Sequence, residues 1–282
     1  MSTDAGLAAF GDVLGPRGRR KAAVATVVGA VVLLALLLVA LARLSQRGQL
    51  AGDRWTEILS AEGVELLAGG LLATLKAAAL AIALSVTIGL VMALGRLSKV
   101  APLRWLAGTY VELFRALPSL LLILFAFFGL PEIVPFPISK YTALVIGLTL
   151  YNSAVMAEIV RAGVLSLPRG QAEAAAALGL RGSQVQRLVV LPQAVSRMLP
   201  SLIAQSVVVL KDTSYGFVIG YEELLRRGQI AGEVTADVLQ AYVIVAVVYV
   251  AVCLALSRVA KQVESRQRRK YGRVASSETR AA

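Results

Sequence analysis

The chemically most suggestive residues of this chain are charged side chains inside an otherwise apolar stretch, residues 195–220. Lys211 and Asp212 interrupt this stretch. The polar segment then continues with Thr213, Ser214 and Tyr215. Ionisable groups within a membrane span are costly and indicate function. Adjacent helical residues point about 100° apart, so Lys211 and Asp212 need not pair with each other. Two interpretations stay open: groups that bind a polar ligand, or a polar lock between helices.

The composition excludes several other kinds of chemistry. The sequence has no histidine and a single cysteine, Cys253, so neither a His or Cys metal cluster nor an internal disulfide can form. The dipeptide Gly-Lys is absent, which rules out a phosphate-binding loop of the form G-x4-G-K-[ST]. We therefore expect no catalytic residue, no metal site and no cofactor in this chain.

The elements that position these residues must lie in a membrane. Of the 282 residues 57% are hydrophobic and 16% are charged, with a mean hydropathy of +0.74. Soluble domains are less apolar and more charged, and disordered chains lack apolar residues. The net charge of +12 is attributed to basic cytoplasmic loops, and no nucleic acid is expected as a partner.

The apolar runs predict an all-α polytopic protein with six membrane helices, because a bilayer core needs roughly 20 apolar residues per helix. The predicted helices cover residues 22–42, 66–95, 107–130, 141–160, 195–220 and 238–257. The first run is longer than the apolar part of a signal peptide, which favours an uncleaved helix over a cleaved leader. Basic residues set the orientation: 20 Lys and Arg fall in one set of loops and six in the other. We expect both termini to be cytoplasmic, in a multi-pass protein of the cell membrane.

The longest inside connection, residues 161–195, predicts two short helices with a bend at Gly179. Ser166 and Pro168 suit the start of the first helix, and glycine is a common helix end. Ser183 and Gln186 fit a capping box for the second helix, and Pro192 marks a boundary before the next span. Such a compact element either docks a partner protein or only connects two spans.

This connection resembles the EAA loop of ABC importer permeases. Glu173-Ala174-Ala175 is followed after three residues by Gly179, and after nine more by Val189, one residue and Leu191-Pro192. Only valine in place of isoleucine departs from the pattern EAA-x3-G-x9-I-x-LP.

The resemblance extends over about residues 66–260 to the permeases that take up histidine, glutamine, glutamate, arginine and opines. It is carried by the segments 70–81, 112–123, 157–179 and 210–214. The helix at 22–42, the segment 1–21 before it and the basic tail 261–282 lie outside it. Two departures are Ala116-Leu117-Pro118, where the family often has Thr-Pro, and Tyr215, where it often has Leu.

The resemblance implies a membrane-spanning subunit of an ATP-driven importer of polar amino acids. Two permease subunits, as a homodimer or a paralogous heterodimer, would form the pore in the lipid bilayer. A dimer of separate ATPase subunits would bind ATP and Mg, and an extracytoplasmic binding protein would deliver the amino acid. The residues implied to couple ATPase and pore are Glu173, Ala174, Ala175, Gly179, Leu191 and Pro192.

A zwitterionic substrate would need a cation for its carboxylate and an acceptor for its amine. The candidates along its pathway are Lys76, Asn152, Ser153, Lys211, Asp212, Thr213, Ser214 and Tyr215. For Lys76, extension of the side chain to the outer surface is an equal alternative. The cations Lys76, Arg115 and Lys211 slightly favour an acidic amino acid such as glutamate.

Further charges are predicted to have structural or docking roles. Arg115 is expected to pair with Glu112, and Arg161 with Glu158, each three residues apart on a helix. The outside segment 221–237, with Glu222 and Glu223, is either a contact for the binding protein or a solvated surface helix. Two rival functions remain: an ion-gradient-driven secondary amino-acid transporter, which would leave the EAA-like loop unexplained, and a membrane scaffold, which would not need charges inside a span.

Overall fold

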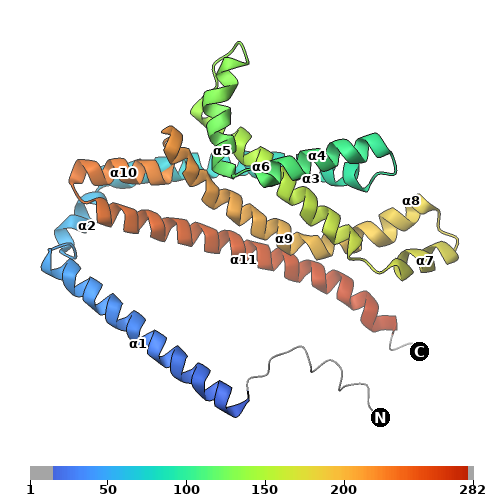
Figure 1. The fold of residues 1–282 in the computed structure, drawn as a ribbon, viewed down its shortest axis with the longest axis horizontal. Helices are drawn as coiled ribbons and strands as arrows, with labels where there is room; N and C mark the ends of the chain where they lie inside the picture. The colour runs from blue at the N-terminus through green and yellow to red at the C-terminus, as the bar shows by residue number, and fades with distance from the viewer. Residues whose placement is uncertain (1–14, 279–282) are drawn as a thin grey trace. The chain divides into compact units, whose positions relative to one another are not determined.

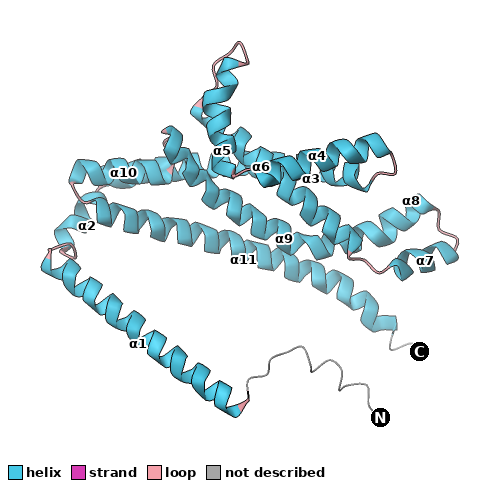
Figure 2. Cartoon of the chain, viewed as in Figure 1, coloured by secondary structure: helices cyan, strands magenta, loops and turns pink. Residues whose placement is uncertain are grey.

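The computed structural model describes residues 15–278, and every regular element in that range is a helix (Figure 2). It divides the chain into two units, residues 1–56 and 57–282, which are described separately. The outermost parts of the predicted terminal segments, residues 1–14 and 279–282, lie outside the described residues.

The first unit contains α1 (Pro16–Gln46) and most of α2 (Gly52–Ile58). α1 includes the whole predicted helix 22–42 and extends it at both ends. Pro16 stands in its first turn, where the missing N–H costs no hydrogen bond. The side chains of α1 are exposed throughout its apolar length, which fits a helix surrounded by lipid.

The second unit is a bundle of long helices joined by shorter ones (Figure 1). The long helices are α3 (Ala61–Leu97), α6 (Lys140–Leu165), α9 (Leu191–Asp212) and α11 (Val238–Glu278). The shorter helices are α4 (Ala101–Ala116), α5 (Ser119–Leu124), α7 (Arg169–Ala177), α8 (Gly182–Val185) and α10 (Leu224–Thr235). In the view of Figure 1, α10 lies at one end of this unit and α7 with α8 at the other.

Four further short segments have tighter or wider turns. They are the π-helices η2 (Phe125–Gly129) and η4 (Gln186–Val190) and the 3-10 helices η3 (Leu130–Glu132) and η5 (Thr213–Ile219).

The pair α3 and α6 forms the centre of the bundle. Small residues let the two helices approach closely: a Cβ at Gly89 would lie 2.9 Å from both Met156 Cβ and the Ser153 carbonyl oxygen. Buried residues of α5, α9 and η5 complete one apolar cluster with this pair around Leu144 and Leu148. A second cluster joins α3 to α10 and α11, and a third joins α3 to α4 and α6.

The all-α, polytopic fold class is confirmed. Five helices in the described part of the chain are long and apolar enough to span a membrane, or six if one bent pair counts as a single span. That pair lies where a continuous helix over 107–130 was predicted. α4 ends at Ala116, Leu117 is extended (φ −92°, ψ 138°), and the chain turns by 101° into the helical stretch Ser119–Glu132, which α5 begins. Proline disfavours helical geometry in the residue before it, so Pro118 accounts for the break.

The predicted fifth helix also differs at both ends. The second short helix of the 161–195 connection is not separate, because α8 continues through η4 directly into α9. At the other end the α-helix stops at Asp212 and tightens into η5, which ends at Gly220 with φ +69°. Lys211 and Asp212 thus lie at the end of α9, not near the middle of a long helix.

Candidate functional site

The residues 168–190 form a helical projection, called here the knob, between α6 and α9. Its first helix, α7, ends in a Schellman motif: the N–H of Gly179 donates to the Ala176 carbonyl (2.9 Å) and that of Leu180 to the Ala175 carbonyl (3.3 Å). Gly179 has φ +84°, a conformation that side-chain-bearing residues rarely adopt. The predicted bend at Gly179 is therefore confirmed.

The start of the second knob helix was predicted at the wrong residue. The helix begins at Gly182, before Ser183, and the Arg181 N–H donates to Gln184 Oε1 (2.8 Å) at its start. The new helix thus starts three residues after Gly179. Pro192 stands in the first turn of α9, at the predicted boundary.

The knob exposes the residues that the EAA pattern singles out. Glu173 and Ala174 are exposed, whereas Ala175 is 6% exposed and packs toward the rest of the knob. Leu178, between α7 and the Gly179 turn, is 85% exposed, and Leu188 on η4 is 65% exposed. Leu191 is exposed and Pro192 half-buried at the base of the knob.

The knob is fastened to the bundle at its base. The Arg197 guanidinium of α9 donates to the Ser166 carbonyl at the end of α6 (2.6 Å). Close packing adds a second attachment: a Cβ at Gly163 would lie 2.9 Å from Met198 Cβ. α6 and α9 therefore meet directly beneath the knob.

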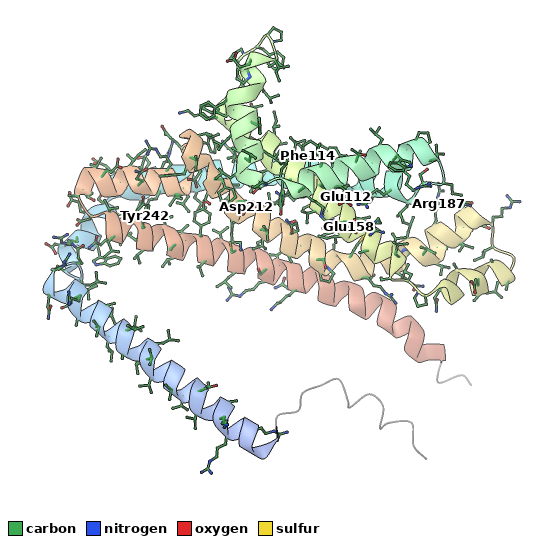
Figure 3. The ribbon with its side chains drawn as sticks, viewed as in Figure 1. Glu112, Phe114, Glu158, Arg187, Asp212 and Tyr242 are labelled. Carbon is green, nitrogen blue, oxygen red and sulfur yellow. The ribbon has the colours of Figure 1, made fainter. Side chains whose placement is uncertain are left out.

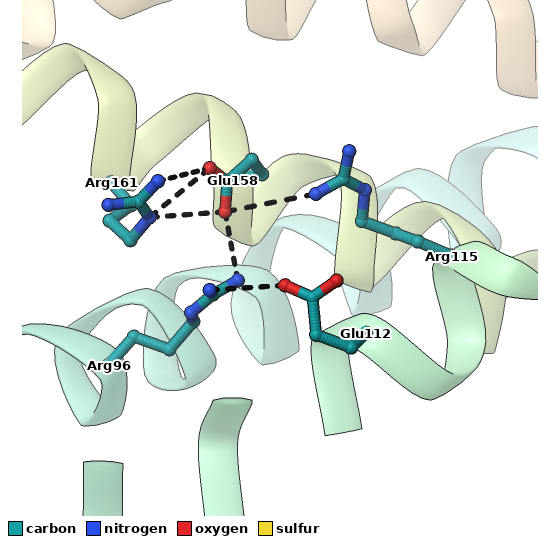
Figure 4. Close-up of polar contacts among 5 residues, drawn as sticks. All are labelled: Arg96, Glu112, Arg115, Glu158 and Arg161. Atoms are coloured by element: carbon teal, nitrogen blue, oxygen red, sulfur yellow. Dashed lines mark hydrogen bonds and ion pairs between the residues drawn. The ribbon is translucent and has the colours of Figure 1, made fainter. Parts of the chain in front are cut away.

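A cluster of five charged side chains lies near this base, on α3, α4 and α6 (Figure 4). In Figure 3, Glu112 and Glu158 are labelled on the side of the bundle toward Arg187 and the knob, away from Asp212 and Tyr242. Glu158 pairs with Arg161, as predicted, by an ion pair and by hydrogen bonds from Arg161 Nε (3.1 and 3.2 Å).

The prediction that Arg115 pairs with Glu112 is wrong. Arg115 Nη1 lies 3.9 Å from Glu158 Oε2, and Glu112 instead accepts from Arg96 Nη2 at 3.2 Å. Arg96 also donates to Glu158 Oε2 from Nη1 (2.9 Å). Arg96 comes from the end of α3, 62 residues from Glu158, so only the tertiary packing of α3 against α6 brings the two together.

The polar segment at 211–215 divides between two sides of α9. Lys211 and Ser214 border a groove of about 450 Å³ against α11, together with Tyr242, Tyr249 and Cys253. Asp212 is half-buried, and Thr213 is fully buried with its hydroxyl donating to the Leu210 carbonyl (2.7 Å). Tyr215 is half-buried and packs against the central apolar cluster. Lys211 is exposed whereas Asp212 is half-buried, so the two adjacent side chains have different surroundings.

The other pathway candidates do not gather around Lys211. Asn152 and Ser153 are fully buried on α6. Asn152 accepts from Gln205 of α9 (2.7 Å), and Ser153 shares a hydrogen bond with Tyr110 of α4 (2.7 Å). Lys76 is exposed on α3. In this conformation Asn152 and Ser153 therefore join helices, and a role in a pathway would require them to become accessible.

The end of the bundle opposite the knob holds a buried carboxylate that sequence reasoning placed at the surface. Glu223 is fully buried and caps α10 by accepting from the N–H groups of Leu225 and Arg226, each at 2.9 Å. Burial raises its pKa, although these two bonds and one from Tyr249 lower it. In segment 221–237, Glu222 is exposed and pairs with Arg227 (3.6 Å). Only Glu222 of the two glutamates is thus available to a partner.

No group of three or more His, Cys, Asp or Glu residues that could hold a metal ion occurs in the described part of the chain.

Comparison with known proteins assigns the chain to a family. Residues 85–269 match the family model of binding-protein-dependent transport system inner membrane components. The glutamate transport system permease protein GluD of Corynebacterium glutamicum is 40% identical over 228 residues, which are 80% of this chain and 84% of that protein. The probable glutamine ABC transporter permease protein GlnP of Bacillus subtilis is 39% identical over 74% of this chain and 96% of its own length.

Solved structures agree with this assignment. A chain from the crystal structure of an amino acid ABC transporter with histidines superposes with a TM-score of 0.70 at 34% identity, over 74% of this chain and 97% of that chain. A chain of the MetNI methionine ABC transporter, at 20% identity and a TM-score of 0.55, shares the fold. The chain therefore belongs to the inner membrane components of binding-protein-dependent transport systems, as a multi-pass permease component of the amino-acid ABC transporter type.

Proposed function

We propose that this chain forms the pore subunit of an importer that carries polar amino acids, glutamate foremost, into the cytoplasm. The observation that carries the proposal is the knob, with Glu173, Ala174 and Leu178 exposed on a turn held by Gly179. The names of the relatives, which cover glutamate, glutamine and arginine transport, support an amino-acid substrate.

In this proposal the knob lies on the cytoplasmic side and enters a cleft of a separate ATPase dimer, which binds ATP and Mg. Leu178 supplies an apolar anchor and Glu173 a charge for a basic group of the ATPase. Ala175 is buried within the knob and keeps the exposed side of α7, with Glu173 and the adjoining Leu178, in place. Leu191 and Pro192 fix the junction of the knob with α9. The 20 basic residues of the loops on the knob side support this orientation.

The remaining partners follow from the same arrangement. A second permease subunit, a copy of this chain or a paralogue, completes the pore. An extracytoplasmic binding protein delivers the substrate at the end that carries α10, where Glu222 is accessible. Lys211 is the cation that meets the substrate carboxylate, with Ser214 beside it on the same groove. Asp212, Thr213, Tyr215, Asn152 and Ser153 complete the pathway when α6 and α9 rearrange; Lys76 on the exposed face of α3 stays a further candidate.

The test of the coupling role is a pull-down of the tagged chain in mild detergent, with Glu173→Lys and Gly179→Asp as variants. We expect a co-expressed ATPase to associate with the wild-type chain and to be lost in both variants. Glu132→Gln, at an exposed position outside the knob, is the matched control. ATPase retention in all four chains would contradict the docking role.

The test of transport is uptake of radiolabelled glutamate into proteoliposomes that hold the complete importer and its binding protein. Uptake should require ATP inside and persist when ion gradients are collapsed. Lys211→Met should raise the glutamate concentration needed for half-maximal uptake. Uptake that follows an ion gradient without ATP would instead support the secondary transporter.

A further inference from the structure

Glu158 holds three helices together through arginines that the proposed function does not otherwise use. It accepts from Arg96 of α3 (2.9 Å), pairs with Arg161 of its own helix and lies 3.9 Å from Arg115 of α4. Arg96 extends the network to Glu112 of α4 (3.2 Å). Figure 4 shows Glu158 at the centre, with a guanidinium group approaching from each of three sides.

The exposed fractions of these side chains indicate which contacts of the network contribute most to stability. Those of Arg96, Glu158 and Arg161 are 19%, 25% and 30%, whereas that of Glu112 is 68%. Exposed pairs contribute little, but partly buried charge-assisted hydrogen bonds are stronger and their loss leaves a charge unpaired. The contacts made by Glu158 should therefore dominate, and the Arg96–Glu112 bond should add less.

The network lies on α6 further into the bundle than the attachment of the knob at Gly163 and Ser166. α6 ends at Leu165, seven residues after Glu158, which is about 10 Å of helix at 1.5 Å per residue. Next to the charges, on the side away from the knob, Ala93, Val111, Ala154 and Ala157 form an apolar contact between α3, α4 and α6. Small side chains there leave little space for one helix to shift without the others.

We propose that Glu158 is a positioning residue that makes the end of α3, the helix α4 and the end of α6 move as one body with the knob. The inference rests on the proposed function, because it is the ATPase that would displace the knob. In this view the force applied at the knob reaches α3 and α4 through the Glu158 carboxylate rather than being absorbed by bending of α6. Glu158 acts through the arginines and does not touch the substrate.

The first experiment compares the ATP hydrolysed per glutamate imported in proteoliposomes containing the complete importer. Glu158→Gln keeps the size of the side chain and one acceptor but removes the charge. We expect ATP hydrolysis to continue while the ATP used per glutamate rises about fivefold or more, the scale of a typical coupling free energy. Arg96→Gln, which removes the link to α3 alone, should give an intermediate rise. Glu132→Gln is the control and should match the wild type.

This ratio separates coupling from mere loss of structure. A variant that folds or assembles poorly loses hydrolysis and uptake together, and the ATP used per glutamate does not change. An unchanged ratio in both Glu158→Gln and Arg96→Gln would therefore overturn the proposal, whatever the total activity.

The second experiment tests directly whether the knob and α4 keep a fixed distance, which is read between two spin labels. Labels at Ser183→Cys on the knob and Leu106→Cys on α4, both exposed, are introduced after Cys253→Ser. Doubly labelled chains are diluted with unlabelled ones so that only distances within a chain are read. The wild-type distance should be the same without nucleotide and with ATP, whereas Glu158→Gln should broaden or shift it. A wild-type distance that changes with ATP would overturn the one-body proposal.

The label pair also separates this inference from the proposed function. If no ATPase associates with the wild-type chain, the proposed function fails, but the isolated chain can still be compared with its Glu158→Gln variant. Identical distance distributions in that comparison would show that Glu158 does not hold α4 and the knob together.

Discussion

Tyr249 of α11 donates its hydroxyl hydrogen to the buried carboxylate of Glu223, with 2.7 Å between Oη and Oε2. The same carboxylate caps α10, and the next residue, Leu224, donates its N–H to Thr74 Oγ1 of α3 (3.1 Å). One buried side chain and its neighbour therefore attach α10 to both α3 and α11 at the end of the bundle opposite the knob. Glycines make this contact close: a Cβ at Gly228 would lie 2.2 Å from Val245 Cγ2.

Replacing Tyr249 should weaken this attachment. Tyr249→Phe removes a hydrogen bond to a charged, buried acceptor, which typically costs about 1.5–3 kcal/mol. We expect a lower midpoint of thermal unfolding in detergent, followed by circular dichroism at the helix band. Tyr242→Phe is the matched control on the same helix, at a residue 36% exposed. Equal midpoints for the two variants would contradict the role of Tyr249.

The buried carboxylate also predicts a pH dependence of stability. Burial raises the pKa of Glu223 above its ordinary value of 4.5, against the lowering effect of the bonds from Leu225, Tyr249 and Arg226. The folded chain then holds this proton at pH values where the unfolded chain has released it. The free energy of unfolding should therefore fall as pH rises through the interval that begins near 4.5.

Glu223→Gln tests this dependence, because glutamine does not titrate. Its unfolding midpoint, measured at half-unit steps from pH 4.5 upward, should change less with pH than that of the wild type. Glu222→Gln, at the exposed neighbour, should keep the wild-type slope. The same slope in the wild type and Glu223→Gln would show that another group is responsible.

Because the turn that ends α7 requires a positive φ at Gly179, substituting alanine at Gly179 and at Gly182 should affect ATPase binding differently. Gly179→Ala places a Cβ at φ +84°, which costs about 1 kcal/mol or more, although the surrounding space is empty. We expect less ATPase to co-purify with this variant. Gly182→Ala adds the same methyl group three residues later, where φ is not positive and nothing lies within 4 Å. It should bind ATPase like the wild type, and a loss of equal size would mean that the methyl group itself blocks docking.

The contact between α5 and α6 predicts a larger effect at Gly147. A Cβ there would lie 2.5–2.6 Å from atoms of Ile123, two of them in the backbone, so one helix would have to move. Gly147→Ala should lower the unfolding midpoint and the yield of monodisperse protein, as overpacking costs about 1–3 kcal/mol. Gly108→Ala, in a helix with open space around it, should be neutral or slightly stabilising. Equal behaviour of the two variants would contradict the close contact.

Patterns among residues close together in the sequence predicted those features of the fold that depend on neighbouring residues alone. The apolar runs located the helices, Gly179 located the bend of the knob, and the spacing of Glu158 and Arg161 identified a pair on one helix. The break at Leu117 was also encoded, by Pro118, but the length of the apolar run 107–130 favoured a straight span. Hydropathy measures the ability to lie in lipid and does not distinguish a straight helix from a bent one.

Contacts between distant segments could not be predicted in this way. Glu112 had a suitable partner three residues away in Arg115, yet it pairs with Arg96, because the packing of α3 against α4 brings that guanidinium closer. Glu223 looked like a surface charge in the mixed segment 221–237. Its carboxylate instead accepts from Tyr249, 26 residues after it, and the N–H of the neighbouring Leu224 donates to Thr74, 150 residues before Leu224.

The single cysteine of the chain has a practical consequence. Cys253 is half-buried on α11 and borders the same groove as Lys211 and Ser214. A thiol-reactive fluorophore or a small alkylating reagent will therefore modify the native chain at one position only. Its rate of reaction, compared with and without glutamate or nucleotide, measures how accessible that groove is in a chain that carries no engineered residue.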